Sequence, residues 1–262
     1  MSSVPAAPSL PFRQDSDDPA QWLGSSRLLD LADTRLRLRA RALTQLCKTD
    51  REKALAIYAY VKRMPFTRSM KLHPRTAREV LDVGKGDSPD KATLLVALLR
   101  LARIPARMRF VQYRGEVMRG LVPHVFTSWR PVVEAWLGGD WVGTDTYIFD
   151  ALYMAGARQR LKDLGWDRGY GIDRDGQGIW NGLEGAWTLG LPPAVDPMAL
   201  QERGCWHDPQ GFQASDAFRA RHRQFTRRMR WNLLAPWIER TIRNLREDER
   251  DMTPGTPLRK PS

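Results

Sequence analysis

Apolar residues recur at helical spacing in several stretches of the chain. Leucines with arginines between them predict a first helix from Arg27 to Cys47. A second helix is expected from Asp50, as its N-cap, through Val61. A short helix from Thr76 to Leu81 should end at Gly84. The strongest helical pattern runs from Ala92 to Ala102, where charges are confined to the two ends.

Strand patterns follow this apolar helix. Ile104-Pro105 ends the helix, and Ala106 to Tyr113 then predicts a strand. Two apolar runs, Pro131–Leu137 and Asp140–Asp145, are separated by Gly138-Gly139, which predicts a β-hairpin because paired glycines adopt the positive φ angles of tight turns.

The rest of the chain is predicted as a helix from Ala151 to Leu164, an irregular segment over 165–185, and a long helix over about 216–244 that contains Pro236. We therefore expect a mobile arm at 1–24, a core domain at 25–200, a basic helical extension at 201–250 and a flexible tail at 251–262.

Composition excludes several classes of protein. The hydrophobic fraction of 42% is too high for a disordered chain, and no apolar run is long enough for a membrane span. The N-terminus lacks the basic start of a secretory signal, and two cysteines, Cys47 and Cys205, make no disulfide framework. A cytoplasmic protein is the expectation.

Three phrases carry a family resemblance. They are Gly84-Lys85-Gly86-Asp87-Ser88 before the apolar helix, Arg103-Ile104-Pro105-Ala106-Arg107, and Arg130-Pro131-Val132-Val133-Glu134 followed by the glycine turn, Trp141-Val142 and Asp145. In this order they resemble the bacterial transglutaminase-like superfamily, which is related in fold to papain-type cysteine proteases. The resemblance covers about residues 50–155. It implies an α+β fold, in which the helix carrying the nucleophile position packs on an antiparallel sheet, here with added N- and C-terminal helices.

The same resemblance implies which residues stand at the catalytic positions. The nucleophilic cysteine of the family falls on Ser88, its histidine on Arg130 and its aspartate on Asp145. Arg130 cannot act as a base, because a guanidinium stays protonated at any working pH. Ser88 is a far weaker acid than a cysteine and would need such a base. The ordinary thiol mechanism is therefore expected to be lost.

Hairpin geometry predicts a partner for Arg130. With Gly138-Gly139 as a two-residue turn, opposed residue numbers sum to 277, and Arg130 becomes a diagonal neighbour of Asp145. Diagonal neighbours lie about 7–8 Å apart at the backbone, within reach of an arginine side chain. We expect an Arg130–Asp145 ion pair, in which Arg130 is structural; the alternatives are a cation for a substrate carboxylate or phosphate and a solvated surface residue.

Ser88 and His124 leave a catalytic alternative open. Ser88 is expected to be a helix N-cap with Pro89 at the first helical position, an arrangement worth about 1 kcal/mol. The alternative is a nucleophile served by His124 and Asp145. This needs a sharp fold of the chain, because His124 lies eight positions before Val132, the expected partner of Asp145, and an extended chain spans roughly 3.3 Å per residue.

The sequence contains no cofactor-binding motif. The Cys205-Trp206-His207-Asp208 run contains residues that could bind a metal ion, but it lacks the spacing of a metal site. The predicted C-terminal helix combines an apolar stripe with arginines, and the formal net charge of the chain is +12. We expect the stripe to pack on the domain. An acidic protein, an anionic membrane surface or a nucleic acid could bind the arginines, of which five are named here: Arg219, Arg223, Arg227, Arg228 and Arg230.

The leading hypothesis is a catalytically degenerate transglutaminase-like domain, which binds a peptide or protein ligand in the groove of the former triad. One alternative is an active acyl transferase, amidase or peptidase-like enzyme that uses Ser88, His124 and Asp145. The other is a basic adaptor that acts through the C-terminal helix.

Overall fold

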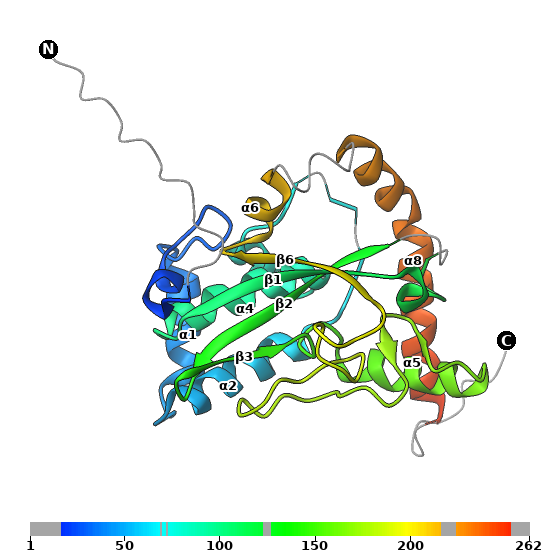
Figure 1. Cartoon of the computed structure of the whole chain (residues 1–262), viewed down its shortest axis with the longest axis horizontal. Coiled ribbons are helices and arrows are strands. Elements are labelled where there is room, and N and C mark those ends of the chain that lie inside the picture. The colour runs from blue at the N-terminus through cyan, green and yellow to red at the C-terminus, as the bar shows by residue number, and fades with distance from the viewer. Residues whose placement is uncertain (1–16, 69, 72, 123–126, 216–223, 253–262) are drawn as a thin grey trace, which may run out of the picture.

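Helices and an antiparallel sheet build the molecule (Figure 1). The computed structural model describes residues 17–68, 70–71, 73–122, 127–215 and 224–252. Its main sheet has the strand order β3-β2-β1-β6, with bounds Asp140–Thr144, Ser128–Leu137, Ala106–Tyr113 and Ala199–Trp206. Helix α4 (Ser88–Leu101) runs behind this sheet. The arrangement confirms the predicted α+β class.

The N-terminal helices start later than the leucine pattern predicts. After a short 3-10 helix, η1 (Pro19–Leu23), helix α1 covers only Thr34–Thr44. Asp33 begins it, because its side chain accepts the backbone N–H of Leu36, and Leu28 and Leu29 are buried outside any helix. The predicted helix from Arg27 is therefore wrong in its first turns.

Helices α2 (Asp50–Arg63) and α3 (Ala77–Val83) lie where the sequence places them. The N-cap of α2 is Thr49 rather than Asp50, because Thr49 and Glu52 form a reciprocal capping box. Helix α3 ends at Gly84, whose φ of +67° is the left-handed conformation that glycine adopts readily.

The central hairpin has the predicted register. Leu137 pairs with Asp140 and Val133 with Thr144, while Gly138 and Gly139 turn the chain at φ angles of +64° and +91°. Strand β1 runs antiparallel to β2, so that Arg107 lies opposite Glu134. This register brings together the Arg103–Arg107 and Arg130–Glu134 segments, on which the family resemblance partly rests. The Nε atom of Arg107 lies 2.6 Å from Oε2 of Glu134.

Strand β6 is absent from the sequence-based expectation. It pairs with β1, so the sheet continues past residue 200, where the predicted core domain ends. The segment after helix α5 (Ala151–Asp163) contains the two-residue strands β4 (Arg168–Gly169) and β5 (Ile172–Asp173). Short helices η2 (Gly115–Met118) and α6 (Pro209–Ala214) complete the loops.

The long C-terminal helix, α8 (Gln224–Met252), contains Pro236 and extends beyond the predicted end at 244; residues 216–223 lie outside the described part. Its buried side chains are Ala235, Ile238, Ile242 and Leu245. The apolar stripe of the described part thus packs on the domain, although Trp237 remains 49% exposed.

Helix α4 forms the centre of the core. Every residue from Asp90 to Arg100 is buried, which explains why its apolar pattern is so strong. Both cysteines are free thiols. Among the described residues, no helix has the length and apolar character required to cross a bilayer.

Candidate functional site

Ser88 lies at the start of α4, but it is not the N-cap. Asp87 has that position and accepts the backbone N–H of Asp90, so Ser88 is the first helical residue. The predicted Ser88 cap is therefore wrong by one residue, because a carboxylate at Asp87 is the better acceptor at the positive end of a helix. Ser88 is half-buried, and its hydroxyl makes no hydrogen bond with any residue that the structure describes.

Arg130 and Asp145 form the predicted ion pair. The Nη1 atom of Arg130 lies 2.8 Å from Oδ2 of Asp145, directly beyond the end of β3. The side chains are 4% and 2% exposed, so the alternative of a solvated surface arginine is wrong.

Thr188 and Gly171 complete the surroundings of this pair. Arg130 also donates from Nη1 to the Thr188 hydroxyl at 2.8 Å and from Nη2 to the Gly171 carbonyl at 2.6 Å. Asp145 accepts the Thr188 backbone N–H on Oδ1 and the Thr188 hydroxyl on Oδ2. Each carboxylate oxygen therefore already has a donor, which offsets the cost of burying the charge. The sequence gives no signal for Thr188, which lies beyond the predicted irregular segment at 165–185.

A second charged cluster borders the start of α4. Its members are Arg68, Lys71, Arg75, Asp87 and Asp90. Lys71 lies 2.7 Å from Asp87 and 2.5 Å from Asp90, while Arg68 pairs with Asp87 and Arg75 with Asp90. The flanking cations hold the pKa of Asp87 low although burial opposes them, whereas burial and the neighbouring Asp87 raise the pKa of Asp90.

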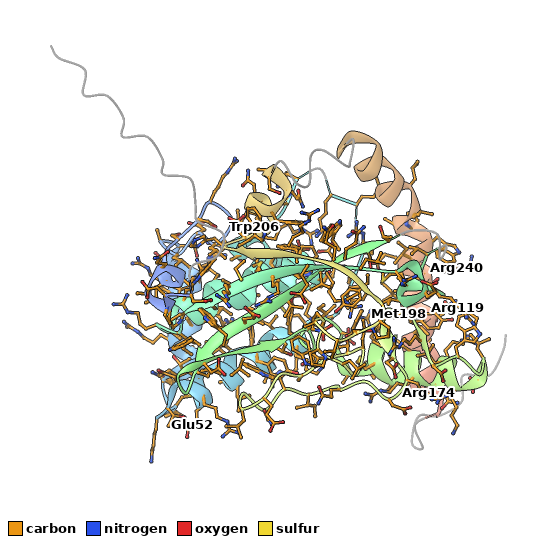
Figure 2. The ribbon with its side chains drawn as sticks, in the orientation of Figure 1. Glu52, Arg119, Arg174, Met198, Trp206 and Arg240 are labelled. Carbon is orange, nitrogen blue, oxygen red and sulfur yellow. The ribbon has the colours of Figure 1, made fainter. Side chains whose placement is uncertain are left out.

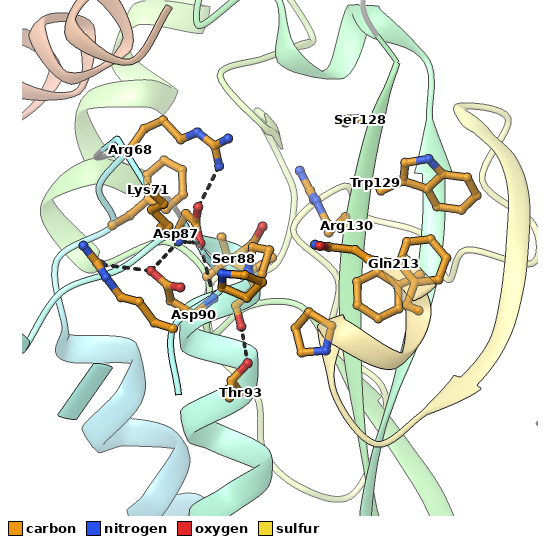
Figure 3. A pocket seen from close by; sticks show the side chains of 18 of the residues that line it. Arg68, Lys71, Asp87, Ser88, Asp90, Thr93, Ser128, Trp129, Arg130 and Gln213 are labelled. Carbon is orange, nitrogen blue, oxygen red and sulfur yellow. Dashed lines mark hydrogen bonds and ion pairs between the residues drawn. The ribbon is translucent and has the colours of Figure 1, made fainter. Parts of the chain in front are cut away.

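Ser88, Arg130 and this cluster surround one cavity of about 240 Å³ (Figure 3). Figure 3 shows Asp87, Ser88 and Asp90 on one wall, and Ser128, Trp129 and Arg130 on strand β2 opposite them. Aromatic and aliphatic side chains, with Ile238 of α8 among them, line the remainder. The structure thus brings Ser88 and Arg130, two of the three residues that the resemblance places at triad positions, to one cavity, and Asp145 pairs with Arg130 from behind it.

Of the other histidines, His73 lines this cavity, with its Nδ1 atom 3.0 Å from the Pro74 carbonyl oxygen. His124 lies outside the described residues. His207 accepts a hydrogen bond on Nδ1 from Arg100 at 2.8 Å and stacks on Trp22. Among the described residues, no group of three potential metal ligands is found.

The basic C-terminal helix is described only in part. Arg219 and Arg223 lie outside the described residues, and the structure gives the helix at Arg227, Arg228 and Arg230 but not their side chains. An anionic partner for these five arginines remains a prediction. Further along α8, Arg240 is exposed at the end of the molecule where Figure 2 also labels Arg119 and Arg174.

Comparisons with known proteins agree with this geometry. Residues 37–146 match the transglutaminase-like superfamily, a range that includes Ser88, Arg130 and Asp145. The chain is therefore similar to this superfamily over these residues. No protein of curated function matches the chain.

Two solved structures are similar to part of the chain. One is a putative cysteine protease from Cytophaga hutchinsonii, 26% identical over 52% of this chain and 42% of that one, with a TM-score of 0.40. The other is a putative protease from Parabacteroides distasonis, 18% identical over 48% of this chain and 24% of that one, with a TM-score of 0.34. The chain thus spans less than half the length of either protein.

Proposed function

We propose that this protein is a non-catalytic transglutaminase-like domain that binds a peptide or protein ligand in the cavity beside Ser88. One observation carries the proposal: the position of the family's histidine holds a buried arginine, which is bonded to Asp145, Thr188 and Gly171. The cavity between α4 and β2 supplies the space for a ligand.

The chemistry of proton transfer supports the absence of catalysis. A serine nucleophile needs a base within hydrogen-bond reach to remove its proton. Arg130 cannot accept a proton, and no described residue forms a hydrogen bond with the Ser88 hydroxyl. If Ser88 attacked a substrate, none of the described residues would therefore be hydrogen-bonded to its hydroxyl to take up the proton.

The competing enzyme would use Ser88, His124 and Asp145. A carboxylate orients a catalytic histidine by accepting its ring N–H. Here Oδ1 of Asp145 accepts the Thr188 backbone N–H, and Oδ2 accepts both Arg130 and the Thr188 hydroxyl. Three of the about four acceptor sites of the carboxylate are therefore already used, and only one, on Oδ1, remains for an imidazole.

A serine-reactive fluorophosphonate probe separates these two functions. We expect no labelling of Ser88 in the wild-type protein, with Ser88→Ala as the background control. Labelling at Ser88 that disappears in His124→Ala would establish the enzyme and overturn the proposal.

Restoring the family's residues tests whether the site geometry survives. The double variant Ser88→Cys/Arg130→His should be alkylated by iodoacetamide at position 88 faster than Ser88→Cys alone. An imidazole can take up the thiol proton and then stabilise the thiolate, whereas the guanidinium of Arg130 cannot accept a proton. Equal rates would mean that the two positions no longer face each other.

Peptide display tests the binding function. We expect selection on the wild-type protein to enrich peptides that Ser88→Trp no longer binds, since the indole would fill part of the cavity. Lys85→Trp is the matched control, because Lys85 is exposed and does not line the cavity. Failure to enrich any peptide, or equal binding by all three proteins, would contradict the proposal.

A further inference from the structure

The cavity beside Ser88 offers two hydroxyl groups that have no hydrogen-bond partner among the described residues. They belong to Ser88 and to Ser128, whose exposed fraction is only 9%. Ser128 and Arg130 are two residues apart on β2, so their side chains lie on the same face of the sheet. A buried polar group without a partner is unfavourable, and a bound acceptor would satisfy it.

The charged side chains around the cavity favour an anion. Arg68, Lys71 and Arg75 line the wall beside Ser88, where Asp87 and Asp90 are the acidic residues. Three cations thus face two carboxylates, and Arg130, on the opposite wall, is paired with Asp145. With Asp145 included, four cations accompany three carboxylates, so cations are in slight excess. Burial raises the pKa of Asp90 to about 6, so its carboxylate becomes neutral only as the pH falls below that value. The positive end of the α4 macrodipole points to the same space.

The rest of the cavity is mostly apolar, although His73, Thr93 and Gln213 also line it. Phe110, Phe149, Phe212 and Ile238 line it, and Phe110 and Phe212 stack with their ring centres 4.1 Å apart. A volume of about 240 Å³ is below the roughly 300–1,000 Å³ of pockets for drug-sized ligands. One aromatic or aliphatic group with a small polar head would therefore suit this space.

We propose that the cavity binds an apolar group that carries a carboxylate, with the carboxylate beside Ser88 and Arg75 and the apolar part against the aromatic rings. This inference rests on the proposed binding function and names its ligand. The carboxylate is either the C-terminus of a peptide that ends in an apolar residue or the head of a free carboxylic acid.

Calorimetric titration with matched acids and amides tests the inference. The probes are acetyl-Gly-Gly-Phe, its C-terminal amide, 3-phenylpropionate and inorganic phosphate. Wild-type protein should bind acetyl-Gly-Gly-Phe at least tenfold more tightly than the amide, because a hydrogen bond to a charged group is worth more than one to a neutral group. If 3-phenylpropionate binds equally well, a free acid is the source of the carboxylate; if it binds more weakly, a peptide C-terminus is.

Two arginines provide the matched variants. Arg75→Gln combined with Ser88→Ala should reduce the preference for the acid to less than about threefold. Arg78→Gln is the control, because Arg78 also pairs with two carboxylates, Asp33 and Asp82, but does not line the cavity. Thermal melting of each variant establishes that it is folded.

Several outcomes would overturn the inference. They are equal affinity for acid and amide, no binding of either, phosphate binding as tight as that of the acid, or an equal loss of preference in Arg78→Gln. Binding of displayed peptides that Ser88→Trp abolishes but C-terminal amidation leaves unchanged would reject the carboxylate and retain the proposed function. Failure of peptide display itself would reject the proposed function.

Discussion

The guanidinium of Arg130 and the carboxylate of Asp145 form an ion pair that is almost completely buried, with 2.8 Å between Nη1 and Oδ2. Such a pair differs from a surface salt bridge, because removing one partner leaves a buried charge without compensation. Replacing one residue of the pair should therefore destabilise the fold, whether or not the pair takes part in ligand binding.

Arg130→Met should lower the free energy of unfolding by about 3–5 kcal/mol, because Asp145 then keeps only the Thr188 donors. Adding Asp145→Asn should recover part of this loss. Urea denaturation measures the free energy of unfolding of the single and the double variant. Arg35→Met is the control: Arg35 pairs with Asp82 at the surface and is 67% exposed, so the change should be below about 1 kcal/mol. Equal small losses in both variants would show that burial of the pair is unimportant.

Lys91 is a buried lysine that holds backbone segments together. Its Nζ donates to the carbonyls of Met64 and Ile148, each at 2.8 Å, and burial lowers its pKa well below the usual range. Lys91→Met should lower the free energy of unfolding by about 2–5 kcal/mol, because each orphaned carbonyl costs about 1–3 kcal/mol. The exposed Lys85 gives the control, Lys85→Met, which should change stability by less than about 0.5 kcal/mol in the same urea titration.

His207 should make the protein less stable in acid. Burial, and secondarily the Arg100 cation, lower its pKa in the folded state to about 4, against 6.5 in the unfolded chain. Between these values the unfolded state binds more protons, so this contribution is complete above about pH 6.5 and is lost as the pH falls toward 4. His207→Asn retains an acceptor for Arg100 but cannot be protonated. Urea midpoints at pH 7.5 and pH 5 should therefore differ less in this variant than in the wild-type protein.

The control for the acid effect is His73→Asn, which removes an exposed imidazole. The urea midpoint of this variant should differ between pH 7.5 and pH 5 as much as that of the wild-type protein. A pH dependence that is unchanged in His207→Asn would mean that other groups cause the acid instability.

Gly156 sets the distance between α5 and α8. A Cβ atom there would lie 1.8 Å from the carbonyl oxygen of Leu245, so Gly156→Ala must push α8 away. We expect a loss of at least about 1–3 kcal/mol from overpacking, and faster proteolysis within α8. Gly24→Ala is the control, because its φ of −68° suits alanine and a Cβ would only reach ordinary contact, 4.0 Å from the Gln21 carbonyl oxygen. Equal melting temperatures of the two variants would show that α8 adjusts without cost.

Local patterns were sufficient for most helices and for the hairpin. The glycine turn at Gly138-Gly139 determines the register of β2 and β3, since a slip by one residue would turn the apolar face of the strand outward. That register alone predicted that Arg130 meets Asp145. The predicted N-cap at Ser88 was wrong by one residue. Asp87 and Ser88 are neighbours that can both cap a helix, and only the folded backbone shows which of them does.

By itself, the sequence therefore determined the transglutaminase-like segments and the register of the hairpin, and it led to the expectation that Arg130 stands at the position of the family's histidine. Only the tertiary structure decided that β6 joins the sheet, that Thr188 covers both oxygens of Asp145, and that Arg68, Lys71 and Arg75 gather beside Ser88. The physical reason is that these contacts join segments far apart in the chain. Their geometry depends on how whole elements pack, whereas a turn or a helix cap depends on a few neighbouring residues.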